Sequence, residues 1–179
     1  WNKMLEGLLF WTGKGVDGFR CDMVEMVPLD FLRWAIANVR KHKSDILFIA
    51  EIYNKANYKP YIEAGFDYLY DKSGFYDALR AVSAGFRPAY WLTDEWHFLG
   101  DMQPRMLNFW ENHDEQRLAS DFFLKDPKKA VAPMTVSLLF NTAAFMLYCG
   151  QEWGENGMEI EGYSGADGRS SIFDFSSLH

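Results

Sequence analysis

Three acidic side chains stand at or shortly after the ends of apolar runs that have the length of β-strands. They are Asp22, Glu51 and Asp114, with Arg20 two residues before the first and His113 next to the last. Side chains two apart on an extended chain point to the same side, so Arg20 reaches Asp22 and keeps its carboxylate ionised and oriented. One acid at a strand end indicates no more than a structural ion pair, because 25 of the 179 residues are acidic. Three acids accompanied by an arginine and a histidine predict an active site that works with carboxylates.

Helical and strand-like segments alternate along the chain. Apolar runs of strand length occupy residues 16–22, 46–50, 66–70, 106–110 and 143–148. Helical patterns precede, separate or follow them at residues 5–11, 28–41, 58–64, 74–84 and 126–140, the last broken near Pro133, with an irregular helix at 85–103. This alternation predicts an α/β fold with a parallel sheet and helical crossovers. Chemistry in such folds lies at the carboxyl edge of the sheet, where all three acids are expected.

The composition is that of an ordinary globular domain, with 49% hydrophobic and 24% charged residues. A net charge of −7 argues against a nucleic-acid partner. The longest apolar run, residues 134–149, contains Ser137 and Asn141 and is expected to be a buried helix and strand, with no membrane span. Cys21 and Cys149 do not make a disulfide framework and are expected to be buried free thiols. The chain opens at Trp1, so we expect the true N-terminus to be absent and assign no compartment.

Four short motifs give the chain a resemblance to a known family. They are Gly18-Phe19-Arg20-Cys21-Asp22, Ala50-Glu51, Asn112-His113-Asp114 and Tyr148-Cys149-Gly150-Gln151-Glu152. In this order the set resembles the signature regions of the α-amylase family of glycoside hydrolases, from residue 1 to about residue 169. The resemblance implies a partial TIM (β/α)8 barrel of about five β/α units, strands 4 to 8. Residues 1–179 would then be the C-terminal portion of the catalytic barrel, with strands 1–3 and the excursion domain absent.

The resemblance also implies a role for each site residue. Asp22 would be the nucleophile, held ionised by Arg20, and Glu51 the general acid that later acts as base. Asp114 would grip sugar hydroxyls and stabilise the oxocarbenium-like transition state, while His113 would donate a hydrogen bond to the same ring. The implied partner is an α-glucan or maltooligosaccharide. The chain itself is expected to hold no metal or cofactor, although calcium is possible in the full-length protein.

Several alternatives stay open on the sequence. The stretch after Asp22 reads Met23-Val24-Glu25-Met26 and lacks the Lys-His pair of many starch-degrading members, so α-1,4 or α-1,6 preference and hydrolysis or transfer are undecided. The rival function is an inactive half barrel that serves as a folding or interaction unit. A different (β/α) enzyme with convergent acids is disfavoured because Arg20 and His113 are both in place.

Two further expectations concern surfaces. Trp91, Trp96 and Trp110 are candidate sugar platforms, although core packing is expected for at least two of them. Five strands cannot close a barrel of this type, so the first and last strands should each present an unpaired edge. We therefore expect the isolated chain to self-associate and to have little or no glycosidase activity.

Overall fold

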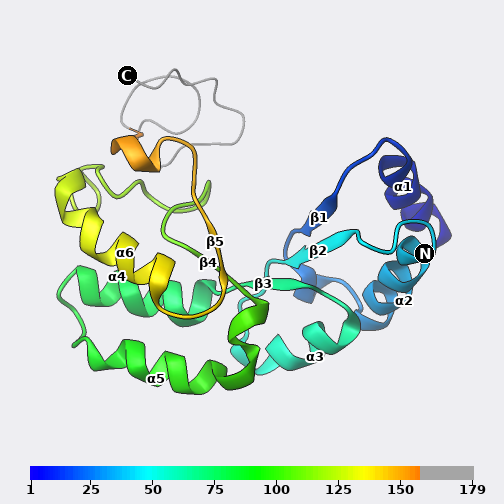
Figure 1. The fold of residues 1–179 in the computed structure, drawn as a ribbon, viewed down its shortest axis with the longest axis horizontal. Coiled ribbons are helices and arrows are strands. Elements are labelled where there is room, and N and C mark those ends of the chain that lie inside the picture. Colours follow the sequence, from blue (N-terminus) through cyan, green and yellow to red (C-terminus); the bar gives the residue numbers. More distant parts are fainter. Residues whose placement is uncertain (158–179) are drawn as a thin grey trace.

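The computed structural model describes residues 1–157 and contains a five-stranded parallel sheet (Figure 1). The strands pair with one another in chain order, each in parallel with the next. Their bounds are β1 Gly18–Cys21, β2 Leu47–Ala50, β3 Tyr68–Tyr70, β4 Met106–Phe109 and β5 Ala144–Met146. The predicted α/β class and the five strands are confirmed, and the strands are shorter than the apolar runs that predicted them.

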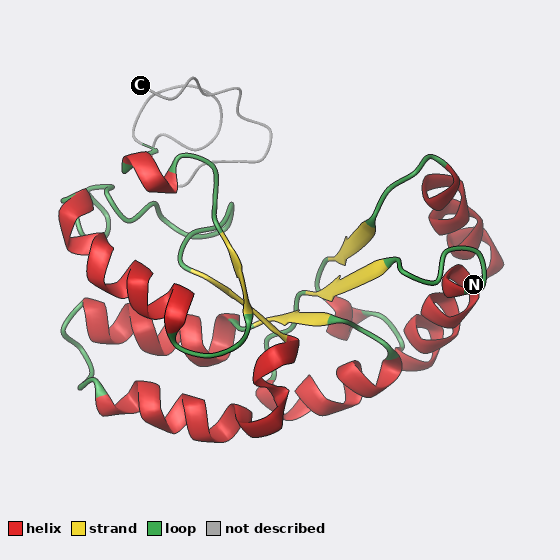
Figure 2. Ribbon diagram, viewed as in Figure 1, coloured by secondary structure: helices red, strands yellow, loops and turns green. Residues whose placement is uncertain are grey.

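The chain has the shape of a crescent (Figure 2). The helices form its outer layer, and the sheet lies on its inner side. The α-helices are α1 Asn2–Gly13, α2 Leu29–Arg40, α3 Tyr58–Ala64, α4 Asp77–Ser83, α5 Tyr90–Leu99 and α6 Val131–Leu139. A π-helical turn, Lys72–Tyr76, precedes α4. Short 3₁₀ turns occupy Val24–Met26, Lys55–Asn57, Gly100–Arg105, Pro127–Ala130 and Gln151–Trp153.

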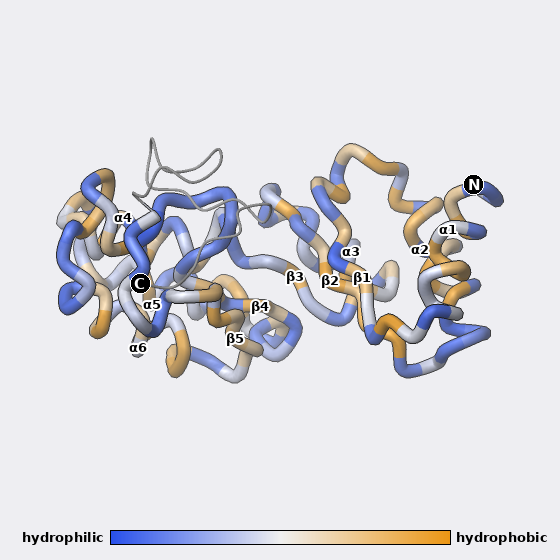
Figure 3. Tube along the Cα trace, turned by 90° about the horizontal axis from the view of Figure 1, so that it is seen from above, coloured by the Kyte–Doolittle hydropathy of each residue, from blue (hydrophilic) through white to orange (hydrophobic). Residues whose placement is uncertain are grey.

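The apolar residues of α2 show why the helices lie on this face. Phe31, Leu32, Ala35, Ile36 and Val39 recur at helical spacing and are all buried. They pack with strand residues in the first of two apolar clusters, which is centred on β1, β2 and α2. A second cluster is centred on β4, α4 and the loop after β4. Figure 3 shows the hydrophobic segments running along these strands and along the facing helices.

Close packing between the first two strands requires a glycine at their start. A Cβ atom on Gly18 would lie 2.8 Å from the carbonyl oxygen of Leu47 on β2. Such a contact is closer than van der Waals packing allows, so a larger residue would push the two strands apart. Gly18 therefore helps to set the spacing at which Asp22 and Glu51 leave neighbouring strands.

Three local expectations are wrong. Residues 127–130 form a 3₁₀ turn and α6 runs through Pro133 without a break, because a proline in the first helical turn lacks only an N–H that has no partner there. Cys149 is exposed and Cys21 is half-buried, so neither thiol is fully buried. Cys149 lies beyond the end of β5, where its apolar neighbours no longer place it in the core.

The candidate platforms differ in burial. Trp110 is completely buried in the second cluster, Trp91 is half-buried and Trp96 is exposed on α5.

Among residues 1–157, no helix is both long and apolar enough to cross a membrane. The loop expected from Glu152 onward lies mostly outside the described residues, apart from the 3₁₀ turn Gln151–Trp153.

The sheet is open at both sides in the part of the chain that the structure describes. There, β1 pairs with β2 alone and β5 with β4 alone, as expected for a barrel that is not closed. Large apolar side chains are exposed near these edges, among them Leu47 on β2 and Leu147 just after β5. Self-association of the isolated chain stays a prediction.

Candidate active site

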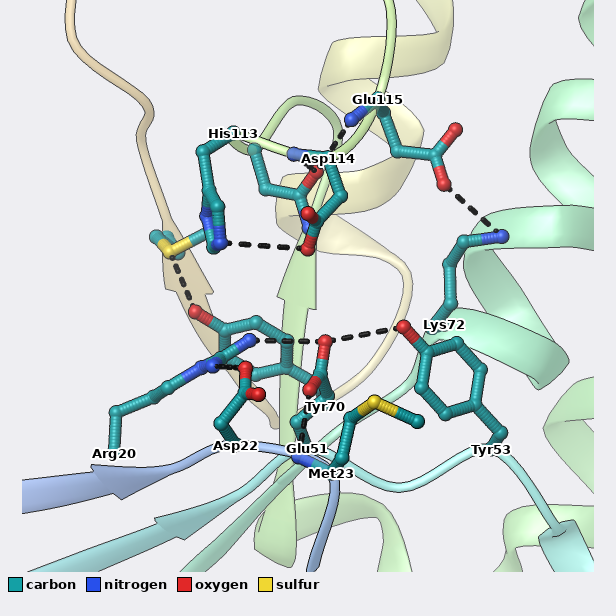
Figure 4. Close-up of polar contacts among 12 residues, drawn as sticks. Arg20, Asp22, Met23, Glu51, Tyr53, Tyr70, Lys72, His113, Asp114 and Glu115 are labelled. Carbon is teal, nitrogen blue, oxygen red and sulfur yellow. Dashed lines mark hydrogen bonds and ion pairs between the residues drawn. The ribbon is translucent and has the colours of Figure 1, made fainter. Parts of the chain in front are cut away.

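The predicted site residues come together at the carboxyl edge of the sheet. Asp22 directly follows β1 and Glu51 directly follows β2, and the register that pairs Cys21 with Ala50 makes the two acids neighbours. His113 and Asp114 lie in the loop after β4, and Figure 4 shows them facing Asp22 and Glu51. The sequence-based expectation that the acids converge on one edge therefore agrees with the geometry.

Arg20 connects the first two acids. One terminal nitrogen contacts Oδ1 of Asp22, and the other lies 2.9 Å from Oε1 of Glu51. The hydrogen bond from Arg20 holds the pKa of Asp22 below its usual value, although the Asp22 side chain is 71% exposed. Beneath the guanidinium lies the Tyr70 ring, whose centroid is 5.4 Å away. This stack fixes the arginine from below while its two nitrogens face the acids.

Glu51 is buried and held from several sides. Its side chain is 4% exposed, and its Oε2 accepts a 2.8 Å hydrogen bond from the backbone N–H of Met23. The Tyr53 hydroxyl donates to Oε1 at 3.1 Å. Met23 has φ 39°, a left-handed conformation that costs a non-glycine residue on the order of 1 kcal/mol. This strained turn directly follows Asp22, and the Met23 N–H within it bonds to the second acid.

The loop that carries His113 and Asp114 is shaped by the residue before them. The Asn112 side-chain oxygen accepts hydrogen bonds from the backbone N–H groups of Asp114 and Glu115, both at 3.0 Å. This Asx-type turn brings His113 Nε2 to 3.4 Å from Asp114 Oδ2. Glu115, the next residue of this loop, lies 3.2 Å from the Lys72 ammonium.

A buried ion pair supports the same loop. Glu111 and Arg117 are almost fully buried, and their charged groups are 3.2 Å apart. Glu111 accepts a 2.6 Å hydrogen bond from Leu118 N–H, while Arg117 donates to the carbonyl of Cys149 at 2.8 Å. Burial raises the pKa of Glu111 to about 7, against the opposing effect of Arg117. The pair thus ties the loop after β4 to the loop after β5.

Sequence reasoning assigned no role to four of these contributors. Met23 and Tyr53 contact Glu51, Tyr70 lies under Arg20, and Asn112 shapes the His113 loop. Of the four, Asn112 alone carried a signal, because it belongs to one of the motifs and asparagine favours such turns. Glu25 is also part of the support, since it accepts hydrogen bonds from the backbone of Tyr53 and from Asn54 and Asn57.

One further buried acid stands at the same edge, after β3. Asp71 is 1% exposed and accepts a 2.9 Å hydrogen bond from the Tyr58 hydroxyl. Burial raises the pKa of Asp71 from 3.8 to about 6. Because this folded-state pKa is raised, the favourable contribution of Asp71 to stability is complete below pH 3.8 and is lost as the pH rises through about 6.

The Asp71→Asn variant should therefore gain stability relative to the wild-type protein as the pH rises from acid to alkaline. The amide does not ionise, so the unfolding free energy of the variant relative to wild type should rise by on the order of 3 kcal/mol between pH 4 and pH 8. Urea unfolding of both proteins at the two pH values measures this difference. Asp94→Asn, which removes an exposed charge from α5, is the matched control. An unchanged difference between pH 4 and pH 8 for Asp71→Asn contradicts the prediction.

Metal binding has no support within residues 1–157. In this range no group of three or more histidine, cysteine, aspartate or glutamate side chains is arranged to hold an ion. Calcium binding by the full-length protein stays a prediction.

Comparisons with known proteins show the family and the fold of the chain. The family model of the α-amylase catalytic domain matches residues 1–175. The α-amylase MalA of Haloarcula japonica is 30% identical over 164 residues, which cover 86% of this chain and 22% of MalA. An α-1,4-glucan:maltose-1-phosphate maltosyltransferase of Picrophilus torridus is 35% identical over 57 residues, covering 32% of this chain and 9% of that enzyme.

Solved structures show the same fold. The maltogenic α-amylase AmyB of Thermotoga neapolitana superimposes with a TM-score of 0.66 at 30% identity, over 86% of this chain and 35% of AmyB. A cyclic maltosyl-maltose hydrolase of Arthrobacter globiformis gives 0.73 at 20% identity, over 91% of this chain and 36% of that one. The chain thus spans about a third of the solved relatives and forms a partial barrel; its assignment to strands 4 to 8 stays a prediction. It belongs to the α-amylase family, within the catalytic domain.

Proposed function

We propose that the complete protein is a retaining glycoside hydrolase or transglycosylase that acts on α-glucosidic bonds of maltodextrin- or starch-like substrates. The contact of one guanidinium, that of Arg20, with both Asp22 and Glu51 carries the proposal. Retaining enzymes hold their two carboxyl groups about 5–5.5 Å apart, whereas inverting enzymes leave about 6.5–9.5 Å for a water. Two carboxylates on the same guanidinium fit the shorter separation.

In the first step Asp22 attacks the anomeric carbon and the glycosidic bond breaks. Glu51, as the acid, gives its proton to the departing glycosidic oxygen, so the leaving sugar departs as a neutral alcohol. The side chain of Asp22 is exposed and ionised, as an attacking group must be, and that of Glu51 is buried beside it. The product is a glycosyl ester on Asp22.

In the second step Glu51, now a carboxylate, removes a proton from the acceptor as it attacks the same carbon. A water acceptor gives hydrolysis, and a sugar hydroxyl gives transfer; either releases Asp22 as a carboxylate. Two inversions leave the anomeric configuration unchanged. Asp114, beside His113, carries a negative charge toward the sugar ring, where positive charge develops in the transition state.

The substrate class rests on the relatives. Their names describe α-amylases, a maltosyltransferase and a hydrolase of a cyclic maltosyl-maltose. These are glycoside hydrolysis and transfer reactions at α-glucosidic bonds. The chain therefore fits a glucan or maltooligosaccharide substrate, with linkage preference left to product analysis.

The test is the stereochemistry and the product pattern of a polypeptide with the complete barrel. Proton NMR should show the α-anomer as the first product from maltotetraose, before mutarotation. Product analysis on panose in parallel separates α-1,4 from α-1,6 cleavage, and longer products reveal transfer. A β-anomer formed first contradicts the retaining mechanism, and absence of cleavage of any α-glucan contradicts the function.

The rival function, an inactive half barrel, is tested on the isolated chain in the same assay. We expect little or no cleavage, because the open sheet lacks neighbours at both edges among the described residues. Burial of the exposed apolar side chains near the open edges against a second copy would contribute about 25 cal/mol per Å². We therefore expect light scattering at micromolar concentration to show oligomers. A compact monomer contradicts the expected association, and measurable maltodextrin cleavage contradicts the expected inactivity.

A further inference from the structure

Tyr53 contacts the acid Glu51 but has no part in the two steps above. It lies two residues after Glu51, in the loop between β2 and α3, and its side chain is 41% exposed. Figure 4 shows its phenol reaching back to the Glu51 carboxylate, where the hydroxyl donates to Oε1 at 3.1 Å. The contact comes from a side chain at the rim of the site.

The donors around Glu51 divide unequally between its two oxygens. Oε1 faces the Tyr53 hydroxyl at 3.1 Å and the Arg20 nitrogen at 2.9 Å. Oε2 accepts one hydrogen bond, from Met23 N–H at 2.8 Å. Oε1 therefore accepts a hydrogen bond from Tyr53 and lies beside the Arg20 cation, whereas the hydrogen bond to Oε2 comes from the backbone. A proton on Oε1 would lie beside the positive charge of Arg20, so the proton is favoured on Oε2.

We propose that Tyr53 is a positioning residue for Glu51: its hydroxyl holds Oε1 beside the Arg20 cation and leaves Oε2 as the atom that carries the transferred proton. This inference rests on the proposed function, in which Glu51 is the acid and base. The Tyr53 hydroxyl also fixes the rotation of the carboxyl group, so that Oε2 keeps one orientation through both steps.

The loop holds Tyr53 firmly enough for this role. Its backbone N–H donates to Glu25 at 2.9 Å, and Glu25 also accepts from Asn54 N–H at 3.2 Å and Asn57 at 2.7 Å. Partial burial and the neighbouring Glu51 raise the pKa of Tyr53 to about 12, so the phenol keeps the hydrogen that it donates. The donor is thus present at neutral pH.

The hydrogen bond strengthens as the reaction proceeds. When Glu51 gives up its Oε2 proton, the carboxyl becomes an anion and the bond from Tyr53 becomes charge-assisted. The hydroxyl therefore stabilises the state in which the proton has left. The effect of the hydroxyl on the rate therefore depends on how much the leaving group needs that proton. A tyrosine with a purely structural role would affect all substrates equally.

The kinetic test is Tyr53→Phe in a polypeptide with the complete barrel. We expect kcat/KM on maltotriose to fall about tenfold and kcat/KM on 4-nitrophenyl maltoside, whose leaving group needs no proton, to stay within about twofold. Tyr61→Phe is the matched control, because it removes a hydroxyl that donates to the Val24 carbonyl at 3.2 Å without contacting Glu51. An equal loss on both substrates, or no loss on either, overturns the role of Tyr53.

A second measurement does not depend on turnover. A ring-fluorinated tyrosine at position 53 has a phenol that titrates in an accessible pH range, and its ¹⁹F NMR signal reports that titration. In the Glu51→Gln background the phenol should titrate at lower pH, because the neighbouring negative charge is gone. An unchanged titration overturns the contact even when the wild-type rate is normal. Absence of any α-glucan cleavage by the unmodified protein overturns the proposed function, and the role of Tyr53 with it.

Discussion

Asp22→Asn in a polypeptide with the complete barrel should abolish turnover of every α-glucoside while the fold stays intact. The amide has nearly the same shape as the carboxylate but cannot form the glycosyl ester, so kcat should fall by about 10⁴-fold or more. The Asp22 side chain is 71% exposed, so its replacement disturbs little of the core. Arg20 loses the charge of Asp22 but keeps its ion pair with Glu51. Initial rates on maltotetraose give the loss, and circular dichroism checks the fold.

The matched control is Asp17→Asn, at the amino end of the same strand. Asp17 is exposed and pairs with Lys43 at 3.0 Å, at the edge of the sheet opposite the site. This variant removes the same charge and should retain activity within about twofold, as expected for an exposed ion pair. Activity of Asp22→Asn within tenfold of wild type would end the assignment of the nucleophile.

Glu51→Gln should separate substrates according to their leaving groups. A sugar leaving group needs the proton that Glu51 supplies, so kcat/KM on maltotriose should fall by about 10²–10⁴-fold. An activated aryl maltoside departs without a proton and should lose far less in kcat/KM, which reports the first step. The amide has a single acceptor oxygen, so it can keep the hydrogen bond from Tyr53 or the one from Met23 N–H but not both, and circular dichroism should check the fold of this variant.

Two other variants serve as controls for this prediction. Glu63→Gln removes an exposed carboxylate from α3 and should leave both substrates unaffected. The same pair of substrates given to Asp22→Asn should show large losses on both, because the nucleophile acts whatever the leaving group is. A loss of equal size on both substrates for Glu51→Gln means that Glu51 has another role.

Local sequence determined the order of the elements and the edge at which the acids lie. The length of each apolar run and the helical spacing of residues such as Phe31, Ile36 and Val39 are properties of short segments, and they predicted five parallel strands with helices between them. Parallel strands end on one edge, so placing Asp22 and Glu51 after neighbouring strands was enough to predict that they meet.

The sequence predicted the bounds of the strands less well. The apolar runs 16–22 and 143–148 predict longer strands than the ladder contains, which includes only Gly18–Cys21 and Ala144–Met146. Apolar character continues beyond the point at which two twisted neighbours still share hydrogen bonds, and that point depends on both strands together. Cys149 is exposed for the same reason, since it lies past the last paired residue.

The tertiary structure alone decided how the acids are held. The bridging position of Arg20 depends on the spacing between β1 and β2, which Gly18 permits through its missing Cβ. The bond from Met23 N–H to Glu51 requires a left-handed backbone at a methionine, which no local preference predicts. Tyr53 reaches Glu51 because Glu25, from another loop, fixes its backbone. These contacts join segments that are distant in the sequence, so their free energies appear only when the whole sheet has formed.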